Sequence, residues 1–369
     1  MRHLALVLAG GGGTRLSPLS TPETPKQFLR LFGEKTLFRE TLERVSFLDE
    51  TIIVHNESMD SLIKSDIQGL KSIRCIQEPV RKNTCPAVAL AANTCDPDDI
   101  LVVFPCDAYV REVEKFEDAI NQAITLANEG LVVSVSTQPI FVSDQFGYVL
   151  GNKFIEKPDM EKAIDLINEG YQWNTGIYAF RVQTFQNLLL QNHPEIQINA
   201  TVENFENCSS ISFDKAISEK CDFIKNVPSD FYWSDVGTFS GLYKVMKEIC
   251  PKDLEYDERP WGNYQVLRDD DIYKMKLLTI HEGEGISLQY HKHRTEIWHI
   301  LEGQGTYINQ PLSESYEKRY YRKDDTIEIP VGNVHQINAE KETKVFEVQI
   351  GDYFGEDDII RIKDKYNRE

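Results

Sequence analysis

The sequence lacks the long apolar runs and the excess of basic residues that mark several classes of protein. No apolar run approaches the roughly 20 residues that a membrane-spanning helix needs. Lysine and arginine number 40 against 59 aspartates and glutamates, which gives a formal net charge of −19. This balance argues against a general binder of nucleic acid or anionic membranes, because phosphate contact needs a basic surface. It leaves open the binding of one nucleotide, which needs only a local positive pocket.

Paired cysteines are also missing. The seven cysteines are an odd number, are scattered along the chain and form no CxxC pair. A disulfide framework is therefore not indicated, and we expect reduced thiols in a cytoplasmic protein. The N-terminal apolar stretch has no signal-peptide cleavage pattern, and we interpret it as a first strand. We expect no nucleic-acid partner, no membrane partner and a homo-oligomeric assembly.

The pattern of apolar residues divides the 369-residue chain into two domains. Over residues 1–250, short runs of valine, isoleucine and leucine alternate with amphipathic stretches. This predicts a mostly parallel, Rossmann-like α/β sheet with helices on both faces and ligands at the carboxyl ends of its strands. Residues 259–369 hold short β-prone runs punctuated by glycine, proline and asparagine, which predicts a small all-β barrel or jelly roll. We place a short acidic linker at residues 251–258.

Four consecutive glycines, Gly10 to Gly13, follow the first apolar run and lead to Thr14, Arg15 and later Lys26. Glycine lets the backbone approach a ligand closely and turn successive N–H groups toward an anion. With two cations beside it, the loop is predicted to bind phosphates. Its spacing matches neither a Walker A loop nor a GxGxxG dinucleotide fingerprint. The alternative is a flexible turn between strand and helix with two solvated cations.

Six motifs, in family order, resemble those of the sugar-nucleotide pyrophosphorylases and, among these, the mannose-1-phosphate guanylyltransferases. They are LAGGGGTRLSPLSTPETPKQF (8–28), RKNTCPAVALAA (81–92), FPCDAYV (104–110), FIEKPD (154–159), WNTGIYAF (173–180) and FYWSDVGTF (231–239). The resemblance covers essentially all of residues 1–250. It implies that GTP and mannose 1-phosphate react to give GDP-mannose and pyrophosphate. A pyrophosphorylase for another sugar or base is the alternative.

The resemblance also implies roles for individual residues. Asp107, at a strand end, and Asp235, in the WSDVG turn, would hold Mg²⁺, a hard cation that prefers oxygen ligands. Arg15 and Lys26 would neutralise the triphosphate and, with the two aspartates, carry catalysis. The implied nucleotide contacts are Gly10, Gly11, Gly12, Gly13, Thr14, Arg81, Asn83 and Thr84, and the implied sugar-phosphate contacts are Glu156, Lys157, Asn174 and Gly147.

A few positions depart from the family pattern. The chain has Gly12, Cys106 and Thr175 where serine is usual, and Ala108 where histidine is usual. An alanine side chain cannot donate a hydrogen bond to a ligand, so the resemblance implies one altered contact on the substrate side.

The second domain gathers three of the eight histidines within SLQYHKHRTEIWHILEG, residues 287–303. Side chains at positions i and i+2 share one face of a strand, so Gln289, His291 and His293 are predicted to point into one barrel. Glu296 can join them across a bend. A lone histidine is more often an ordinary surface or core residue, but this combination of donors favours a site for Zn²⁺ or another divalent ion.

The same region resembles the cupin motif pair and, more closely, the type II phosphomannose isomerase domain. The matching segments are RPWGNY (259–264), SLQYHKHRTEIW (287–298) and FEVQIGDYFGEDDIIRIKDKYNR (346–368). The resemblance implies interconversion of fructose 6-phosphate and mannose 6-phosphate, and the alternative is a non-catalytic binding or assembly module. The implied metal ligands are Gln289, His291, Glu296 and His335, and Arg361 is a candidate for the sugar phosphate.

Two features of the second domain differ from the usual pattern. Ile297 replaces a histidine that usually follows the glutamate, and on a strand it should point away from the ligand face. The segment that joins the two domains is also much shorter than in the usual bifunctional enzymes.

Overall fold

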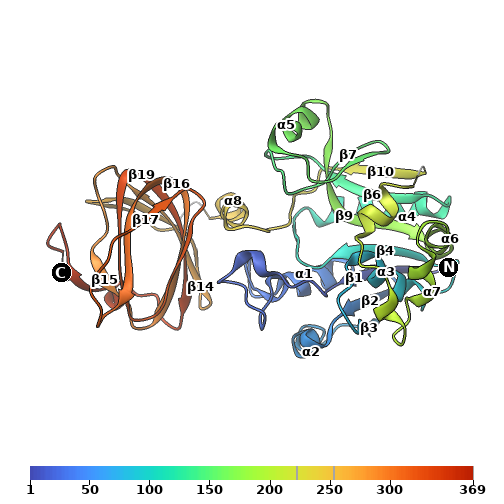
Figure 1. Cartoon of the computed structure of the whole chain (residues 1–369), viewed down its shortest axis with the longest axis horizontal. Coiled ribbons are helices and arrows are strands. Elements are labelled where there is room, and N and C mark those ends of the chain that lie inside the picture. The colour runs from blue at the N-terminus through green and yellow to red at the C-terminus, as the bar shows by residue number, and fades with distance from the viewer. Residues whose placement is uncertain (222, 252–253, 369) are drawn as a thin grey trace. The chain divides into compact units, whose positions relative to one another are not determined.

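The computed structural model describes residues 1–221, 223–251 and 254–368 and divides into two compact units (Figure 1). The first unit comprises Met1–Gly13 and Pro22–Asp235, and the second comprises Thr14–Thr21 and Val236–Glu369. Of the linker predicted at 251–258, residues 252 and 253 lie outside the described residues, as does residue 369 of the second domain.

The first unit is built on a mostly parallel sheet. Its main strands, in spatial order, are β10 (Ile224–Ser229), β6 (Val132–Thr137), β9 (Gln172–Arg181), β4 (Ile100–Pro105), β1 (His3–Leu8), β2 (Glu50–His55) and β3 (Ile73–Gln77). Neighbours pair in parallel except at β9, which runs antiparallel to both β4 and β6. The short strands β7 (Tyr148–Leu150) and β8 (Lys153–Ile155) pair beside β9.

Helices cover both faces of this sheet because its strands are apolar on both sides. In β1, Ala5 and Val7 join one core cluster, whereas Leu4 and Leu6 join the other. The first cluster includes residues of α1 (Leu37–Arg44), α2 (Asp60–Asp66), α4 (Val113–Asn128) and α5 (Met160–Asn168). The second includes residues of α3 (Thr84–Ala92), α6 (Val182–Asn192) and α7 (Pro194–Asn199).

Two very short strands connect distant parts of the first unit. Strand β5 (Tyr109–Val110) pairs antiparallel with β11 (Trp233–Ser234), with Ser234 opposite Tyr109. Asp107 lies just before β5 and Asp235 just after β11. Because the two strands run in opposite directions, this register brings the two aspartates to the same end of the pair.

The second unit is a barrel-like sheet of antiparallel strands (Figure 1). The strands are β12 (Tyr256–Arg259), β13 (Gly262–Asp269), β14 (Tyr273–Ile280), β15 (Leu288–Tyr290), β16 (Arg294–Pro311), β17 (Arg319–Arg322), β18 (Thr326–Ile329), β19 (Asn333–Gly351) and β20 (Ile360–Lys363). The long strands β16 and β19 pair along most of their length and form its centre. Strand β12 begins inside the predicted linker.

Helix α8 (Phe239–Ile249) packs within the second unit, against β13, β16 and β19. It is amphipathic: Phe239, Leu242, Val245 and Met246 are buried. His299 on β16 stacks on Phe239 and lies 2.9 Å from Ser240 Oγ, which fixes the start of the helix. Helix α8 therefore belongs to the second unit, which begins again at Val236. The boundary predicted from the sequence lies later in the chain and places α8 in the first domain.

The predicted fold class is confirmed: a mostly parallel α/β sheet with helices on both faces precedes a β-rich barrel. The antiparallel direction of β9 was not predicted. Among the described residues, no helix is both long and apolar enough to cross a membrane.

Candidate active sites

The glycine loop leaves the carboxyl end of β1 and is held in place by polar side chains. Gln27 Nε2 donates to the carbonyl oxygen of Gly11 at 2.9 Å, and Asn56 Nδ2 donates to that of Gly10 at 3.2 Å. Gly13 has φ +55° and lies so close to the backbone of Lys26 that a Cβ would collide with it. In the described part of the chain, the N–H groups of Gly10 to Gly13 have no backbone acceptor. They remain available to a ligand.

A cleft of about 240 Å³ opens beside this loop. Asn83, at φ +70°, caps helix α3 by accepting a hydrogen bond from Thr84 N, so the chain turns sharply into the cleft. The structure thus brings most of the predicted nucleotide contacts together. The cleft is lined by Leu8, Gly10, Gly11, Gly12, Val54, Glu78, Arg81, Asn83, Thr84 and Ala87.

Glu78 is a lining residue that the sequence analysis missed. Its side chain is buried, with 5 % exposure, and Gly10 packs directly against its carboxylate. Burial raises the pKa of Glu78, and the charge of Arg81 opposes this rise. A buried carboxylate that faces a cleft needs hydrogen-bond donors, so its position favours a ligand that brings them.

Asp107 and Asp235 both contact Lys26. The ammonium group of Lys26 lies 2.7 Å from Asp107 Oδ2 and donates to the backbone carbonyl oxygen of Asp235. The lysine is 3 % exposed, whereas the Asp107 side chain is 34 % exposed. The structure therefore joins the predicted lysine and both predicted Mg²⁺ ligands, with one carboxylate open to a ligand.

A second cleft of about 260 Å³ adjoins the first, and the two share Leu8, Gly11 and Thr84. It reaches Asp107 and continues to Tyr178 and Asp214. The Tyr178 hydroxyl donates to Asp214 Oδ1 at 2.5 Å. Sequence reasoning missed both residues, because no local pattern marks them.

The predicted sugar-phosphate contacts also lie together. Asn174 N donates to the carbonyl oxygen of Gly147 at 2.8 Å, and the Glu156 carboxylate packs against Gly147. Lys157 Nζ lies 3.3 Å from Glu156 Oε1. Burial and then the charge of Asp214 raise the pKa of Glu156. A carboxylate, an amide and an ammonium group in one place can contact sugar hydroxyls and a phosphate.

Thr14 and Arg15 are the remaining predicted residues of this site. They lie in a short 3₁₀ helix, Thr14–Leu16, which groups with the second unit. Neither lines the two clefts.

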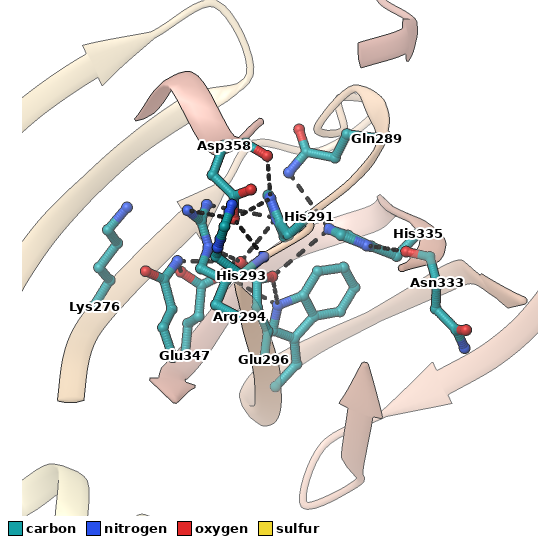
Figure 2. A network of polar contacts seen from close by, with 12 residues as sticks. Lys276, Gln289, His291, His293, Arg294, Glu296, Asn333, His335, Glu347 and Asp358 are labelled. Atoms are coloured by element: carbon teal, nitrogen blue, oxygen red, sulfur yellow. Dashed lines mark hydrogen bonds and ion pairs between the residues drawn. The ribbon is translucent and has the colours of Figure 1, made fainter. Parts of the chain in front are cut away.

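In the barrel, His291, Glu296 and His335 meet so closely that their ligand atoms all lie within 4.8 Å of one another (Figure 2). His291 Nε2 lies 3.0 Å and His335 Nε2 lies 3.7 Å from oxygens of Glu296. Gln289 Nε2 is 3.5 Å from His335 Nε2. Among the described residues, His291, Glu296 and His335 form the cluster of metal-ligand type.

The outer nitrogen of each imidazole is engaged by a backbone carbonyl. His291 Nδ1 lies 3.1 Å from the oxygen of Asp358, and His335 Nδ1 lies 2.9 Å from that of Asn333 (Figure 2). A carbonyl can only accept, so each Nδ1 carries a proton, and Nε2 is the ring nitrogen that each imidazole can offer to a metal ion beside Glu296. This orientation is typical of metal-binding histidines, and the donor set therefore fits a divalent ion.

The ionisation of these groups follows from their burial and from one another. Burial lowers the pKa of His335 to about 4 despite the nearby carboxylate of Glu296. At His291, burial also acts to lower the pKa, but the charge of Glu296 outweighs it and the pKa is raised. Burial acts to raise the pKa of Glu296, but the imidazole of His291 holds it well below its usual value.

The prediction that His293 points into the barrel is wrong. Its side chain is 50 % exposed and faces Asp352. Strand β15 ends at Tyr290, and residues 291–293 turn toward β16, so the alternation of a strand does not continue to His293. Ile297 is buried, and it alternates with Glu296 and Trp298, whose indole N–H donates to Glu296. Ile297 is therefore on the other face, as predicted.

The loop that precedes β20 supports this turn. Asp358 accepts hydrogen bonds from the N–H groups of Lys292 and His293, while its own carbonyl receives His291. Arg294, which is 2 % exposed, lies 3.2 Å from Glu296 Oε1 and donates to the carbonyl of Gly355 at 3.0 Å. The segment GEDDI (355–359) thus fixes the turn at residues 291–293 through these hydrogen bonds.

A cavity of about 60 Å³ in the barrel is lined by Gln289, Glu296 and Arg361, all predicted site residues. It also contains Glu347, which sequence reasoning missed. Glu347 and Glu296 share two donors: the indole N–H of Trp298, at 3.1 Å from each, and the amide of Gln349, at 2.8 and 3.1 Å. Burial and then the charge of Glu296 raise the pKa of Glu347 to about 7.

Fold and sites together define an α/β domain with a glycine-rich phosphate-type loop, followed by a β-barrel with a metal-type site. The nucleotidyl transferase family model matches residues 4–252, and the chain belongs to this family. A second model, described as mannose-6-phosphate isomerase C-terminal, matches residues 253–364. The predicted succession of a nucleotidyltransferase domain and a mannose-6-phosphate isomerase domain is confirmed.

Curated relatives match nearly the whole chain. Mannose-1-phosphate guanylyltransferase 2 of Escherichia coli O157:H7 is 27 % identical over 480 residues, which cover 99 % of this chain and 98 % of the relative. A mannose-1-phosphate guanylyltransferase of Klebsiella pneumoniae is 28 % identical over 477 residues, with 99 % of both chains covered. These spans exceed 369 residues, so the relatives carry additional residues within the aligned region.

Solved structures of two related proteins also resemble this chain. Mannose-1-phosphate geranyltransferase of Thermus thermophilus is 30 % identical, with a TM-score of 0.62, over 66 % of this chain and 79 % of the other. Mannose-6-phosphate isomerase of Helicobacter pylori is 28 % identical, with a TM-score of 0.57, over 63 % of this chain and 100 % of the other.

Proposed function

We propose that the first domain transfers a guanylyl group from GTP to mannose 1-phosphate, which yields GDP-mannose and pyrophosphate. The meeting of Asp107, Asp235 and Lys26 beside a cleft that begins at the glycine loop carries this proposal. The names of relatives that match the whole chain support the choice of sugar and nucleotide. We further propose that the second domain interconverts fructose 6-phosphate and mannose 6-phosphate.

In the transfer, an oxygen of the sugar phosphate attacks the α-phosphorus of GTP. A new oxygen–phosphorus bond forms, the bond to the β-bridging oxygen breaks, and pyrophosphate leaves with the electron pair. The nucleophile is already ionised, so the protein need not remove a proton, and its task is positioning and charge neutralisation. The N–H groups of the glycine loop and the charge of Lys26 serve this purpose.

Mg²⁺ fits the aspartate pair, because carboxylates leave positions for phosphate oxygens and water around a hard, octahedral ion. When bound, the ion neutralises charge on the reacting phosphates. Lys26 orients the pair by contacting a carboxylate oxygen of Asp107 and the carbonyl of Asp235.

The isomerisation moves one proton between C1 and C2 and one hydroxyl proton between O1 and O2, so no atom is gained or lost. We propose Glu347 as the group that carries the proton between the carbons. It lines the cavity, and the donors that it shares with Glu296 hold it in place. A pKa of about 7 suits a carboxylate that must both accept and return a proton near neutral pH.

We propose a divalent ion, Zn²⁺ or another, at His291, Glu296 and His335, with Gln289 as a fourth donor. When bound, such an ion polarises the oxygens at C1 and C2. The protein's own contribution is to fix both imidazoles through the carbonyls of Asp358 and Asn333.

One assay grid tests both activities. Pyrophosphate release is measured with each nucleoside triphosphate against several hexose 1-phosphates, and isomerisation is measured separately with fructose 6-phosphate. We expect GTP with mannose 1-phosphate to react fastest. A clear preference for another pair contradicts the proposed specificity, and absence of mannose 6-phosphate formation contradicts the isomerase.

The cellular setting is proposed on the same basis. We propose a cytoplasmic homo-oligomer that acts on small-molecule substrates and has no nucleic-acid or membrane partner. The seven cysteines all lie in the described part of the chain and form no disulfide, which supports a reducing compartment.

A further inference from the structure

The barrel cavity has positive charge at the end away from the histidines. The ladder of strands shows this arrangement. On β16, Trp298 is opposite Glu347 of β19, which is in turn opposite Lys276 of β14. Lys276 therefore lies roughly 10 Å, or two strand spacings, across the sheet from the strand of Glu296. Figure 2 shows Lys276 beyond Glu347 as seen from the histidines.

The ammonium group of Lys276 is buried but weakly engaged. Lys276 is 5 % exposed and lines the cavity. Its ion-pair partner among the described residues is Glu356, at 3.4 Å, and it also lies 4.8 Å from the ring centre of Tyr264. An ammonium group has three donors, so donors remain for a ligand in the cavity.

Arg259 lies at the same end. Its guanidinium is 5.5 Å from the ring centre of Tyr264, the ring that Lys276 also contacts, and 3.9 Å from Glu356. It also pairs with Asp257 at 2.7 Å. Glu356 is thus a single carboxylate placed near two cations at distances longer than a good charge-assisted hydrogen bond.

We propose that Lys276 and Arg259 form the binding site for the phosphate of the sugar substrate, and that Glu356 occupies this site as an internal anion until the phosphate displaces it. The inference rests on the proposed isomerase function. With the sugar's C1 and C2 oxygens at the histidine end and Glu347 between, the phosphate at C6 reaches the lysine end. A phosphate dianion presents more acceptors and more charge to both cations than one carboxylate does.

This assignment differs from the sequence-based candidate, Arg361. Arg361 is on β20 opposite Gln289, which in turn pairs with His335. Strands β14 and β15 both pair with the edge of β19 opposite β16, so Arg361 lies next to the His335 end of that edge, whereas Lys276 lies opposite Glu347 further along β19. Arg259, Lys276 and Arg361 all line one cavity. Single substitutions can therefore show which of them binds the phosphate.

The test measures binding of inorganic phosphate by calorimetry and the KM for fructose 6-phosphate, with the full-length protein. Lys276→Met should weaken the binding of inorganic phosphate and raise the KM for fructose 6-phosphate, each roughly ten- to hundredfold. This is the scale of a lost hydrogen bond to a charged group. Lys276→Arg should retain most of the binding, because the cation remains. Lys274→Met is the matched control, since Lys274 is on the same strand but pairs with Asp269 outside this cavity.

Glu356→Gln provides the sharper result. If Glu356 competes with phosphate, its neutral variant should bind inorganic phosphate several-fold more tightly. A purely structural ion pair would instead give unchanged or weaker binding with a lower melting temperature, and that result overturns the proposal. The proposal is also overturned if Arg361→Met abolishes phosphate binding while Lys276→Met does not. Failure of the wild type to isomerise fructose 6-phosphate contradicts the proposed function instead, and the phosphate titrations still test this site.

Discussion

The ammonium group of Lys26 lies 2.7 Å from Oδ2 of Asp107 and also contacts the backbone carbonyl of Asp235. The lysine is almost fully buried, and burying a charge is costly unless it is paired. Because these contacts join the segment after the glycine loop to two distant strand ends, Lys26 stabilises the geometry of the aspartate pair as well as supplying charge.

Replacement of either aspartate should therefore impair nucleotidyl transfer. Asp107→Asn and Asp235→Asn each keep the side-chain shape but remove a charged ligand. Each should lower kcat of pyrophosphate release roughly a hundredfold or more, the scale of a lost transition-state charge stabiliser. Isomerase activity is the internal control, because its site is in the other domain. Near wild-type transfer rates in both variants would show that the pair is not the metal site.

We expect the buried carboxylate of Glu78 to select the nucleobase by accepting hydrogen bonds from it. Guanine offers two adjacent donors, N1–H and the N2 amino group, to a carboxylate. In Glu78→Gln one acceptor becomes a donor, so kcat/KM for GTP should fall about ten- to hundredfold. ITP lacks the N2 amino group, and the preference of the wild type for GTP over ITP should shrink in the variant.

Glu57→Gln is the control for this experiment, since Glu57 is exposed. The measurement is kcat/KM for GTP and ITP at a fixed concentration of mannose 1-phosphate. An unchanged GTP-to-ITP ratio in Glu78→Gln would place recognition of the base elsewhere.

Local sequence patterns were sufficient to predict the two fold classes and the glycine loop. Apolar runs fix strands such as β1 and β4, and loops at their carboxyl ends carry Gly10 and Asp107. The partnership of Asp107 with Asp235 came from the family resemblance alone. Its physical cause is the register of β5 and β11, which no local pattern shows because the two strands are far apart in the sequence.

Other site residues depend on tertiary packing. Glu78 and Asp214 become lining residues only when the clefts form around them. Glu347 carried no usable signal: it alternates with apolar residues in FEVQI, and that pattern ordinarily places the polar side chain on the solvent face of a strand. The prediction for His293 was wrong because the alternation of a strand was assumed to continue past Tyr290, where β15 ends.

Loss of the metal ion that we propose in the barrel should abolish isomerisation and leave nucleotidyl transfer intact. His291→Ala removes one of the imidazoles whose Nε2 faces Glu296, so metal content measured by mass spectrometry should fall with isomerase activity. Pyrophosphate release should be unchanged. His293→Ala is the matched control, since His293 is next to the site but exposed. Equal metal loss in both variants would contradict the assigned ligand set, and stoichiometric metal without isomerisation under any divalent ion would favour a binding module.

The packing of α8 on the barrel should depend on pH through His299. Both of its ring nitrogens lie 2.9 Å from hydroxyl groups, of Ser240 and Thr326. Burial lowers the pKa of His299, and the charge of Asp324 only partly opposes this. The unfolded chain takes up the proton near the ordinary histidine pKa of about 6.5, whereas the folded protein resists it. The neutral histidine thus contributes stability above this pH, and the contribution is lost as the pH falls below it.

His299→Gln retains a donor and an acceptor but does not titrate, so its stability should vary less with pH. We expect the variant to be less stable than the wild type at pH 8 and the difference in stability to narrow at pH 5, by less than about 1.4 kcal/mol for each pH unit below the ordinary histidine pKa. Urea unfolding of both proteins at the two pH values measures this difference. His281→Gln serves as the control, because the His281 side chain is 52 % exposed. A difference that stays constant between pH 8 and pH 5 would mean that His299 keeps the same protonation behaviour folded and unfolded, and that its hydroxyl contacts act by packing alone.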